Sequence, residues 1–344
     1  MNQGGPRARS ARSPSPLMLP HAVPGPGPAP ASPACPGIDR HAHLEGSLDP
    51  AWVRSEAARR GLELPASLAA LWRREAQPFQ AFIEAFLFGA ALLDSREAVR
   101  AAVAAAVARL GPAPRGLDLW VSPHFLVVWK QQLSLEDLWR GLEAGIAEAR
   151  SQGAAVAVVL DAVNHFGPSH GSEVLDLTLG GLPAFVRGFS TGGLERVPFR
   201  EWAPVFERAR KAGLRLAAHA GENGPGANVR EALDAGVERI VHGVRAAGEP
   251  ALLALLAERG VPVDICLASN RALLPELAEA AAHPLPAMLR AGVRCALGTD
   301  DPGVIPCDLA EEWAAARVLG LTDAEMAGLA ENAAADAWCL NSGL

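Results

Sequence analysis

Two histidines separated by a single residue, His41 and His43, end a short predicted strand that begins at residue 37. Residues two apart on a β-strand point to the same face, so the two imidazole rings can aim at one point. Neutral imidazole is the commonest metal ligand in proteins, and Zn²⁺ accepts its nitrogen at about 2.0–2.1 Å. A single pair of this kind is also typical of partly exposed polar residues, so its interpretation depends on the rest of the chain.

Four later stretches each place polar residues directly after a short apolar run. They are His219-Ala220-Gly221-Glu222, His242-Gly243, Ser269-Asn270 and Thr299-Asp300-Asp301-Pro302. Three histidines and one carboxylate form a suitable ligand set for a catalytic zinc, with water or substrate in the remaining position. We therefore predict that one Zn²⁺ per chain is bound by His41, His43, His219 and Asp300.

Two other kinds of metal site fit the sequence poorly. One class of zinc enzyme, the deaminases that bind zinc through a Pro-Cys-x-x-Cys element, is excluded because this element does not occur in the chain. A two-metal site would need a bridging ligand, often a modified lysine. Neither lysine of the chain, Lys130 or Lys211, follows a predicted strand. A single zinc is therefore the expectation.

Short apolar runs rich in β-branched residues alternate with amphipathic runs along most of the chain. The strand candidates are residues 37–43, 117–122, 155–161, 184–190, 214–219, 238–242, 262–267 and 293–299. The helical patterns between them include residues 134–151, 200–212, 228–235, 250–259 and 284–291. Eight alternating strand and helix units predict an α/β fold, specifically a (β/α)₈ TIM barrel.

The Ala-rich segment 50–110 is too long for one crossover, and we expect it to add two to four helices after the first strand. Active sites of such barrels lie where the C-terminal ends of the strands meet. The polar stretches listed above all follow predicted strands, so they are expected to converge at that mouth.

Residues 1–36 hold ten of the 28 prolines of the chain and are predicted to form a disordered N-terminal arm, with the barrel spanning 37–344. The arm lacks the apolar stretch of about 7–15 residues that marks a secretory signal. Met18 offers a second point at which translation could start. The role of the arm stays open at the level of sequence.

The net charge of −7 argues against nucleic acid or a membrane surface as a partner, because both attract basic patches. No apolar run approaches the roughly 20 residues that span a bilayer. The five cysteines are scattered and lack Cys-x-x-Cys spacing, which is typical of reduced thiols and indicates a cytoplasmic protein. The oligomeric state cannot be read from the sequence.

The stretch His41-Ala42-His43-Leu44-Glu45-Gly46-Ser47, the four later stretches and Asn332-Ala333-Ala334 resemble the adenosine deaminase family, a branch of the amidohydrolase superfamily. The motifs occur in the family's order and at similar separations, and the resemblance covers about residues 37–340. It implies a zinc-dependent enzyme that removes the 6-amino group of a small purine by hydrolysis and releases ammonia.

The resemblance also implies a role for each of four residues. His242 would accept a proton from the attacking water or hold that water electrostatically, and Glu222 would protonate a ring nitrogen. Such an acid needs a pKa raised by a dry, apolar pocket. Asp301 would hydrogen-bond a second ring nitrogen and help to place the water. The backbone N–H of Gly193 would meet the purine, which a residue without Cβ allows to approach closely.

The substrate is less well defined by the sequence. Adenosine or deoxyadenosine, converted to inosine or deoxyinosine, is the first expectation, with adenine or aminodeoxyfutalosine as alternatives. Family members acting on adenosine commonly carry Asp where this chain has Glu45, which is expected to bind substrate and resembles the adenine-specific branch. A barrel metallohydrolase for an amide or ester, and a non-catalytic purine-binding relative, are the alternatives from other classes.

Several other residues are expected to be structural. His124, His165 and His170 have no partner among the motifs. The aromatic residues Trp72, Phe79, Phe82 and Phe86 are expected to form the core of the inserted helices. In the resembling family this insertion often covers the mouth of the barrel, so the segment 50–110 is also the candidate lid.

Overall fold

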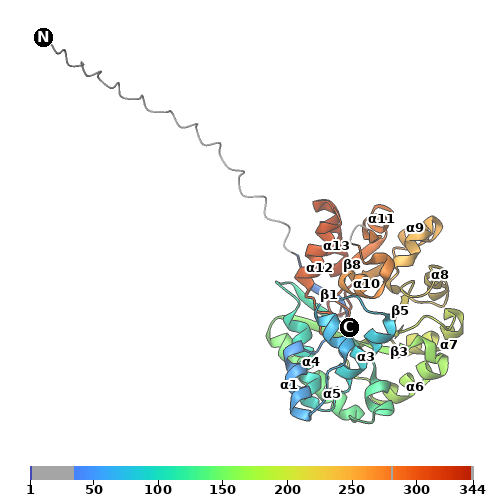
Figure 1. Cartoon of the computed structure of the whole chain (residues 1–344). Coiled ribbons are helices and arrows are strands. Elements are labelled where there is room, and N and C mark those ends of the chain that lie inside the picture. The colour runs from blue at the N-terminus through green and yellow to red at the C-terminus, as the bar shows by residue number, and fades with distance from the viewer. Residues whose placement is uncertain (2–34, 280–281, 342–344) are drawn as a thin grey trace. The chain divides into compact units, whose positions relative to one another are not determined.

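Eight parallel β-strands, hydrogen-bonded in sequence order, form the centre of the computed structural model (Figure 1). The structure describes Met1, residues 35–279 and residues 282–341. The last strand returns to the first through a bridge between Ala42 and Asp300, where the His43 N–H donates to the Asp300 carbonyl at 2.7 Å. Helices surround the strands, so the chain is a (β/α)₈ TIM barrel, as predicted.

The strands lie within two residues of their predicted ends. They are β1 (Gly37–His43), β2 (Arg115–Val121), β3 (Ala154–Val163), β4 (Val186–Gly192), β5 (Arg215–Ala220), β6 (Arg239–His242), β7 (Pro262–Ile265) and β8 (Arg294–Leu297). The N-terminal arm was predicted for residues 1–36, of which 2–34 lie outside the described residues.

The segment between β1 and β2 forms four helices, the upper end of the range expected. They are α1 (Pro50–Arg60), α2 (Ala66–Trp72), α3 (Phe79–Ala90) and α4 (Arg96–Ala108). The helices that follow are α5 (Leu135–Ser151), α6 (Pro168–Thr178), α7 (Phe199–Lys211), α8 (Ala227–Asp234), α9 (Pro250–Glu258), α10 (Leu267–Leu273), α11 (Leu285–Arg290), α12 (Leu309–Val318) and α13 (Asp323–Asp336). In the described part of the chain, no helix is both long and apolar enough to cross a bilayer.

Five shorter helical turns follow strands or helices: the π-helix η1 (His124–Trp129) and the 3₁₀-helices η2 (Asn164–Phe166), η3 (Leu179–Gly181), η4 (Val244–Gly248) and η5 (Pro275–Leu277). Side-chain caps explain where several longer helices begin. Asp49, Ser95 and Ser134 accept backbone N–H groups at the first turns of α1, α4 and α5. Asp308 and Thr322 form complete capping boxes at α12 and α13.

The core has two parts that match the two faces of the strands. The larger apolar cluster lies between the strands and the helices, and a smaller one inside the barrel includes Trp120, Val159 and Val241. Trp338, after α13, closes this inner cluster. A Cβ on Gly188 would lie 2.1 Å from the Trp338 ring, so glycine at this position lets the indole pack against β4.

An irregularity in β1 sets the direction of the first histidines. The register with β2 shifts between Asp39 and Ala42. The Asp39 carboxylate accepts the His41 N–H at 3.0 Å and the Thr299 N–H at 3.2 Å. It thereby joins β1 to the end of β8. Bulges next to active sites commonly re-aim a side chain, and here the shift directs His41 toward the mouth.

Candidate active site

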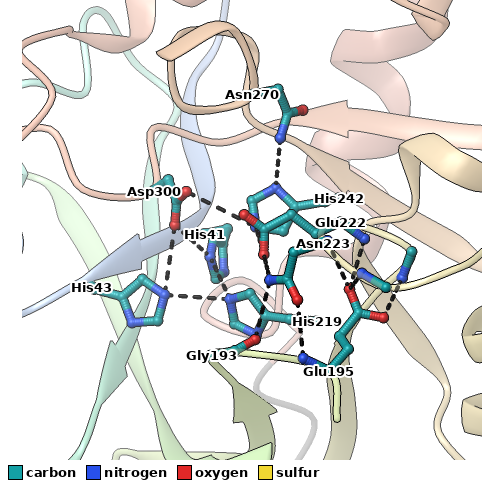
Figure 2. Close-up of polar contacts among 12 residues, drawn as sticks. His41, His43, Gly193, Glu195, His219, Glu222, Asn223, His242, Asn270 and Asp300 are labelled. Carbon is teal, nitrogen blue, oxygen red and sulfur yellow. Dashed lines mark hydrogen bonds and ion pairs between the residues drawn. The ribbon is translucent and has the colours of Figure 1, made fainter. Parts of the chain in front are cut away.

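The four predicted ligands converge at the mouth of the barrel (Figure 2). His41 Nε2 lies 3.1 Å from Asp300 Oδ1 and 3.2 Å from His219 Nε2. His43 Nε2 lies 3.3 Å from His219 Nε2 and 3.6 Å from Asp300 Oδ1. All four ligand atoms lie within 4.8 Å of one another, although they come from β1, β5 and the loop after β8.

This cluster fits a single zinc. Zn²⁺ binds imidazole nitrogen and carboxylate oxygen at about 2.0–2.2 Å, so ligand atoms that lie 3.1–3.6 Å apart can share one ion, with a further position for water or substrate. Burial lowers the pKa of His41 and of His43 to about 3, so both rings are neutral and have a lone pair to offer. The Thr191 carbonyl lies 2.9 Å from His219 Nδ1, so Nδ1–H donates there and Nε2 is left to coordinate.

Two of the site residues adopt positive φ angles, which residues other than glycine rarely take. Asp300 has φ of 63° and His242 has φ of 62°. Such strain persists only where surrounding contacts enforce it, and it clusters at functional sites. Burial alone would raise the pKa of Asp300, but the hydrogen bond with His41 and the charges of nearby histidines hold it well below its usual range.

Glu222 and His242 lie beside the ligand cluster and close to each other. His242 Nε2 is 3.7 Å from Glu222 Oε2 and 3.9 Å from Asp300 Oδ2. Glu222 is 5 % exposed, and burial raises its pKa to about 7. A carboxyl group with this pKa still carries its proton near neutral pH, as a general acid must.

A chain of hydrogen bonds determines which nitrogen of His242 carries a hydrogen. The Leu285 N–H donates to His283 Nδ1 at 3.2 Å, so a neutral His283 has its hydrogen on Nε2. His283 Nε2 then donates to Asn270 Oδ1 at 3.3 Å, and Asn270 Nδ2 donates to His242 Nδ1 at 3.1 Å. A neutral His242 therefore carries its hydrogen on Nε2, the nitrogen that faces Glu222 and Asp300.

Three further predicted residues lie at the mouth, in different settings. Asp301 is 3 % exposed, lines the same cavity, and occupies space that a Cβ on Gly46 would fill. Gly193 also lines the cavity, with φ of 77°. Glu45 is fully buried and accepts the Ser122 N–H at 2.8 Å, and it is not among the described residues that line this cavity.

Glu195 has a structural role that sequence reasoning missed. Its carboxylate accepts backbone N–H groups of the turn after β5, from Gly221 and Glu222 at 2.8 Å and from Asn223 and Gly224 at 3.0 Å. This turn carries Glu222, so Glu195 fixes the position of the acid (Figure 2). The sequence signal that could have identified Glu195 is a charged residue two positions after Gly193, in a turn at the end of a predicted strand.

A cavity of about 350 Å³ opens beside the ligand cluster. One side is apolar, formed by α3 and η1. It includes Phe79, Phe82, Phe86, Phe125 and Trp129. The α3 aromatics pack against the core, as expected from the sequence, and they also line the cavity, in line with the alternative that segment 50–110 forms the lid. The inserted helices therefore include part of the lid.

Two polar residues of the cavity wall were not assigned to it from the sequence. His165, expected to be structural, lines the cavity and accepts the Leu194 N–H at 3.2 Å. Asp161, on β3, lines it as well and had not been singled out. His124 and His170 form a separate group in which His124 Nε2 is 3.1 Å from Glu173 Oε2.

Comparison with known proteins gives a consistent family. The model of the adenosine deaminase family matches residues 36–343. The chain is 35% identical over 316 residues to an adenine deaminase of Streptomyces coelicolor, covering 86% of this chain and 88% of that protein. It is 33% identical over 306 residues to an aminodeoxyfutalosine deaminase of Acidothermus cellulolyticus, covering 84% of each.

Among solved structures, an adenine deaminase of Arthrobacter aurescens superposes with a TM-score of 0.78 at 28% identity, covering 88% of this chain and 94% of that one. The residues matched by the family model, 36–343, include every residue of the site described above. The chain therefore belongs to the adenosine deaminase family of hydrolytic deaminases, within the amidohydrolase superfamily.

Proposed function

We propose that the chain is a zinc-dependent hydrolytic deaminase of a 6-aminopurine and that its first substrate is adenine. The observation that carries the proposal is the ligand cluster of His41, His43, His219 and Asp300 beside the buried carboxyl of Glu222. This arrangement supplies a metal-binding site and an acid that holds its proton near neutral pH. Hydrolysis of a purine C–N bond needs both.

Adenine replaces adenosine as the preferred substrate. The similar proteins reported above are named for adenine and for aminodeoxyfutalosine, and none of them is named for adenosine. The order of substrates expected from the sequence is therefore reversed. Aminodeoxyfutalosine is the second candidate because the relative named for it is 33% identical over most of both chains.

A zinc ion bound at the cluster would supply a water whose pKa is lowered to about 7 and which can attack near neutral pH. His242 Nε2 lies 3.9 Å from Asp300 Oδ2, beside the ligand cluster, so its N–H would donate a hydrogen bond to the attacking oxygen. This favours the electrostatic role over that of a proton acceptor, the two roles expected for His242 from the sequence.

Glu222 donates its proton to N1, the ring nitrogen beside the attacked C6 carbon. This removes negative charge from the ring as the C6–O bond forms. The Glu222 carboxylate then takes the proton of the new C6 hydroxyl and passes it to the amino group, so that C6 becomes a carbonyl, N1 keeps its hydrogen and the C6–N bond breaks to release ammonia. The proton that water loses in forming the attacking hydroxide restores the Glu222 carboxyl. Asp301, held close to Asp300 on the same loop, hydrogen-bonds N7 on the other side of C6. The two carboxyl groups thus fix the plane and the orientation of the purine.

The test is ammonia release from adenine, aminodeoxyfutalosine and adenosine at matched concentrations, with zinc-loaded protein. We expect kcat/KM to be highest for adenine. Release that is fastest from aminodeoxyfutalosine would support the second candidate. No release from any of the three, or hydrolysis of simple amides and esters alone, would overturn the proposal.

A further inference from the structure

Asp161, near the end of β3, is a buried acid that the mechanism above does not use. It is 5 % exposed and lines the same cavity as His43, His219 and Glu222. Its Oδ1 has no hydrogen-bond partner among the described residues. The neighbouring Ser190 hydroxyl interacts with the same carboxyl group. Buried polar atoms in native proteins are rarely left without a partner, so Oδ1 is open to a donor that a ligand brings into the cavity.

Neighbouring polar groups of the same wall already have partners within the protein. The Ser122 N–H donates to Glu45 at 2.8 Å, and His165 Nδ1 accepts the Leu194 N–H at 3.2 Å. On this side of the cavity the Asp161 carboxyl is thus the acceptor left for a ligand.

Gly192 keeps the space beside this carboxyl open. A Cβ on Gly192 would lie 2.8 Å from Asp161 Oδ2 and 3.3 Å from the His219 ring. Both groups therefore border the same small volume, and a side chain at position 192 would intrude on it. Burial raises the pKa of Asp161 well above its usual range, with the charge of Glu45 adding to the effect. Both effects fit an acid enclosed in the binding cavity.

The strand order places Asp161 on the wall beside His219 and across the barrel from the strands that carry His242 and Asp301. The ligands, Glu222, His242 and Asp301 come from the ends of β1, β5, β6 and β8. These four strands are arranged symmetrically about β7, and β3 is the strand opposite β7 in the eight-stranded barrel. In a purine, N3 is directly opposite C6 in the six-membered ring, and N9 follows N3 along that edge. A purine whose C6 faces the ligand cluster therefore turns its N3–N9 edge toward β3.

We propose that Asp161 accepts a hydrogen bond from N9–H of a free purine base and so selects the base over N9-substituted nucleosides. The inference rests on the proposed function and defines its substrate class. A carboxyl group has an accepting oxygen in either protonation state, so the contact does not depend on the charge of Asp161. A nucleoside has no hydrogen on N9, so with adenosine or aminodeoxyfutalosine bound Asp161 would stay without its partner.

The test compares kcat/KM for adenine and for 9-methyladenine, which lacks the N9 hydrogen and adds little volume. A site built to bind a substrate N–H rejects an analogue without it, so we expect the wild type to prefer adenine by about 10²-fold or more. Asp161→Ala should lose most of this preference by slowing adenine alone. Asp161→Asn keeps an accepting oxygen and should retain more of it.

Asp176→Asn is the matched control, because Asp176 is 66% exposed and pairs with Arg208 outside the cavity. It should leave the ratio unchanged, and zinc content and melting temperature verify that each variant is folded. An unchanged ratio in Asp161→Ala would overturn the proposal. So would a wild type that prefers adenosine and loses that preference in Asp161→Ala, because the carboxyl would then contact a ribose hydroxyl.

A wild type that deaminates none of adenine, 9-methyladenine and adenosine would refute the proposed function, and the Asp161 contact with it. A wild type that deaminates all three with equal efficiency would keep the deaminase function and overturn the Asp161 contact alone. The two failures are therefore distinguishable in one set of assays.

Discussion

The chemistry of the site depends on buried side chains whose proton occupancy differs from that in water. His41 and His43 are neutral because burial lowers the pKa of each to about 3, so protons compete little with a metal at neutral pH. Glu222 differs from a carboxylate in water because burial raises its pKa to about 7. The same apolar surroundings thus leave the imidazole lone pairs free for a metal and keep protons on part of the Glu222 carboxyl groups near neutral pH.

Glu222→Gln is expected to lower turnover of adenine by about 10²–10⁴-fold, because the amide keeps the shape of the side chain and has no acidic proton. In the wild type, kcat/KM should fall as the pH rises above about 7, where the raised pKa of Glu222 places the loss of its proton. The variant should lack this part of the profile. Ammonia release measured from about pH 5 to pH 9 tests both statements.

Glu201→Gln, on the exposed face of α7, is the control and should behave like the wild type. Near-normal turnover in Glu222→Gln would rule out this residue as the acid. An alkaline decline that persists unchanged in the variant would assign that decline to another group.

The hydrogen-bond chain from His283 through Asn270 gives a second prediction. Asn270→Asp offers His242 Nδ1 an acceptor in place of a donor, so the hydrogen of His242 moves to Nδ1 or the ring becomes charged. We expect kcat to fall about 10²-fold, with little change in KM or zinc content. Ser269→Ala is the control, since the Ser269 hydroxyl is buried without a partner among the described residues.

The ¹⁵N chemical shifts of His242 should differ between Asn270→Asp and the wild type, a readout that a purely structural role would not move. Wild-type kcat in Asn270→Asp would contradict the assigned hydrogen positions. Asn270→Ala leaves His242 Nδ1 without a partner, and its kcat should lie between the values for the wild type and for Asn270→Asp.

The elements that hold the site are the turns after the strands rather than the strands themselves. The turn after β5 carries Glu222, and four of its backbone N–H groups point to the Glu195 carboxylate from the turn after β4. Asn228, at the start of α8, adds a side-chain donor at 2.8 Å. One carboxylate thus joins two turns and a helix.

Glu195→Gln should therefore weaken both stability and catalysis. An amide has one accepting oxygen, so it cannot replace all five hydrogen bonds, and hydrogen bonds to charged groups contribute about 1.5–3 kcal/mol each. We expect a melting temperature lower by about 3–10 °C and a clear loss of kcat. Glu143→Gln, exposed on α5, is the control. Wild-type values for Glu195→Gln would show that the turn holds its position without the carboxylate.

The sequence was most informative where a residue type and a strand end coincide. His41, His43, His219 and Asp300 were identified because each lies at the end of a predicted strand, and barrel topology brings strand ends together. Contacts between strands that are distant in sequence leave no comparable pattern. Asp161 could not be assigned to the site for this reason. Its position in the alternating pattern of β3 is that of an ordinary strand residue.

The inserted helices show the same limit at the scale of elements. Their number could be estimated from length, but which face of α3 covers the cavity depends on how the helix docks. The aromatic residues of α3 are compatible with a core or a lid, and in the structure they serve both. The hydrogen-bond chain to His242 could not be foreseen either, because it joins Asn270 of α10 to His283, two residues before α11, through side-chain geometry alone.

In the molecule as a whole, the end of the barrel opposite the mouth is closed by buried charges. Arg239 donates to Asp118 at 2.8 Å, and its guanidinium lies 3.9 Å from the centre of the Trp338 ring. Arg40 pairs with Asp264, both fully buried. Removing one partner of such a pair is strongly destabilising. One end of the barrel is thus rigidly filled, and the other is free to bind substrate.

Removal of residues 1–34 is expected to leave the enzyme essentially unchanged. Every strand, helix and site residue described above lies between residues 35 and 341. We predict a melting temperature within about 2 °C of the full chain and kcat/KM within about twofold. A larger loss in either measurement would show that the N-terminal segment contributes to the barrel or to its site.

The central claim is that a single zinc at the four-ligand cluster makes this chain a deaminase. It is tested most directly by removing all metal with a chelator and adding zinc back while ammonia release from adenine is measured. We predict no activity without metal, a linear rise, and saturation at about one zinc per chain, with neither binding nor activity in His219→Ala. Full activity in metal-free protein, or saturation at two zinc ions per chain, would contradict it.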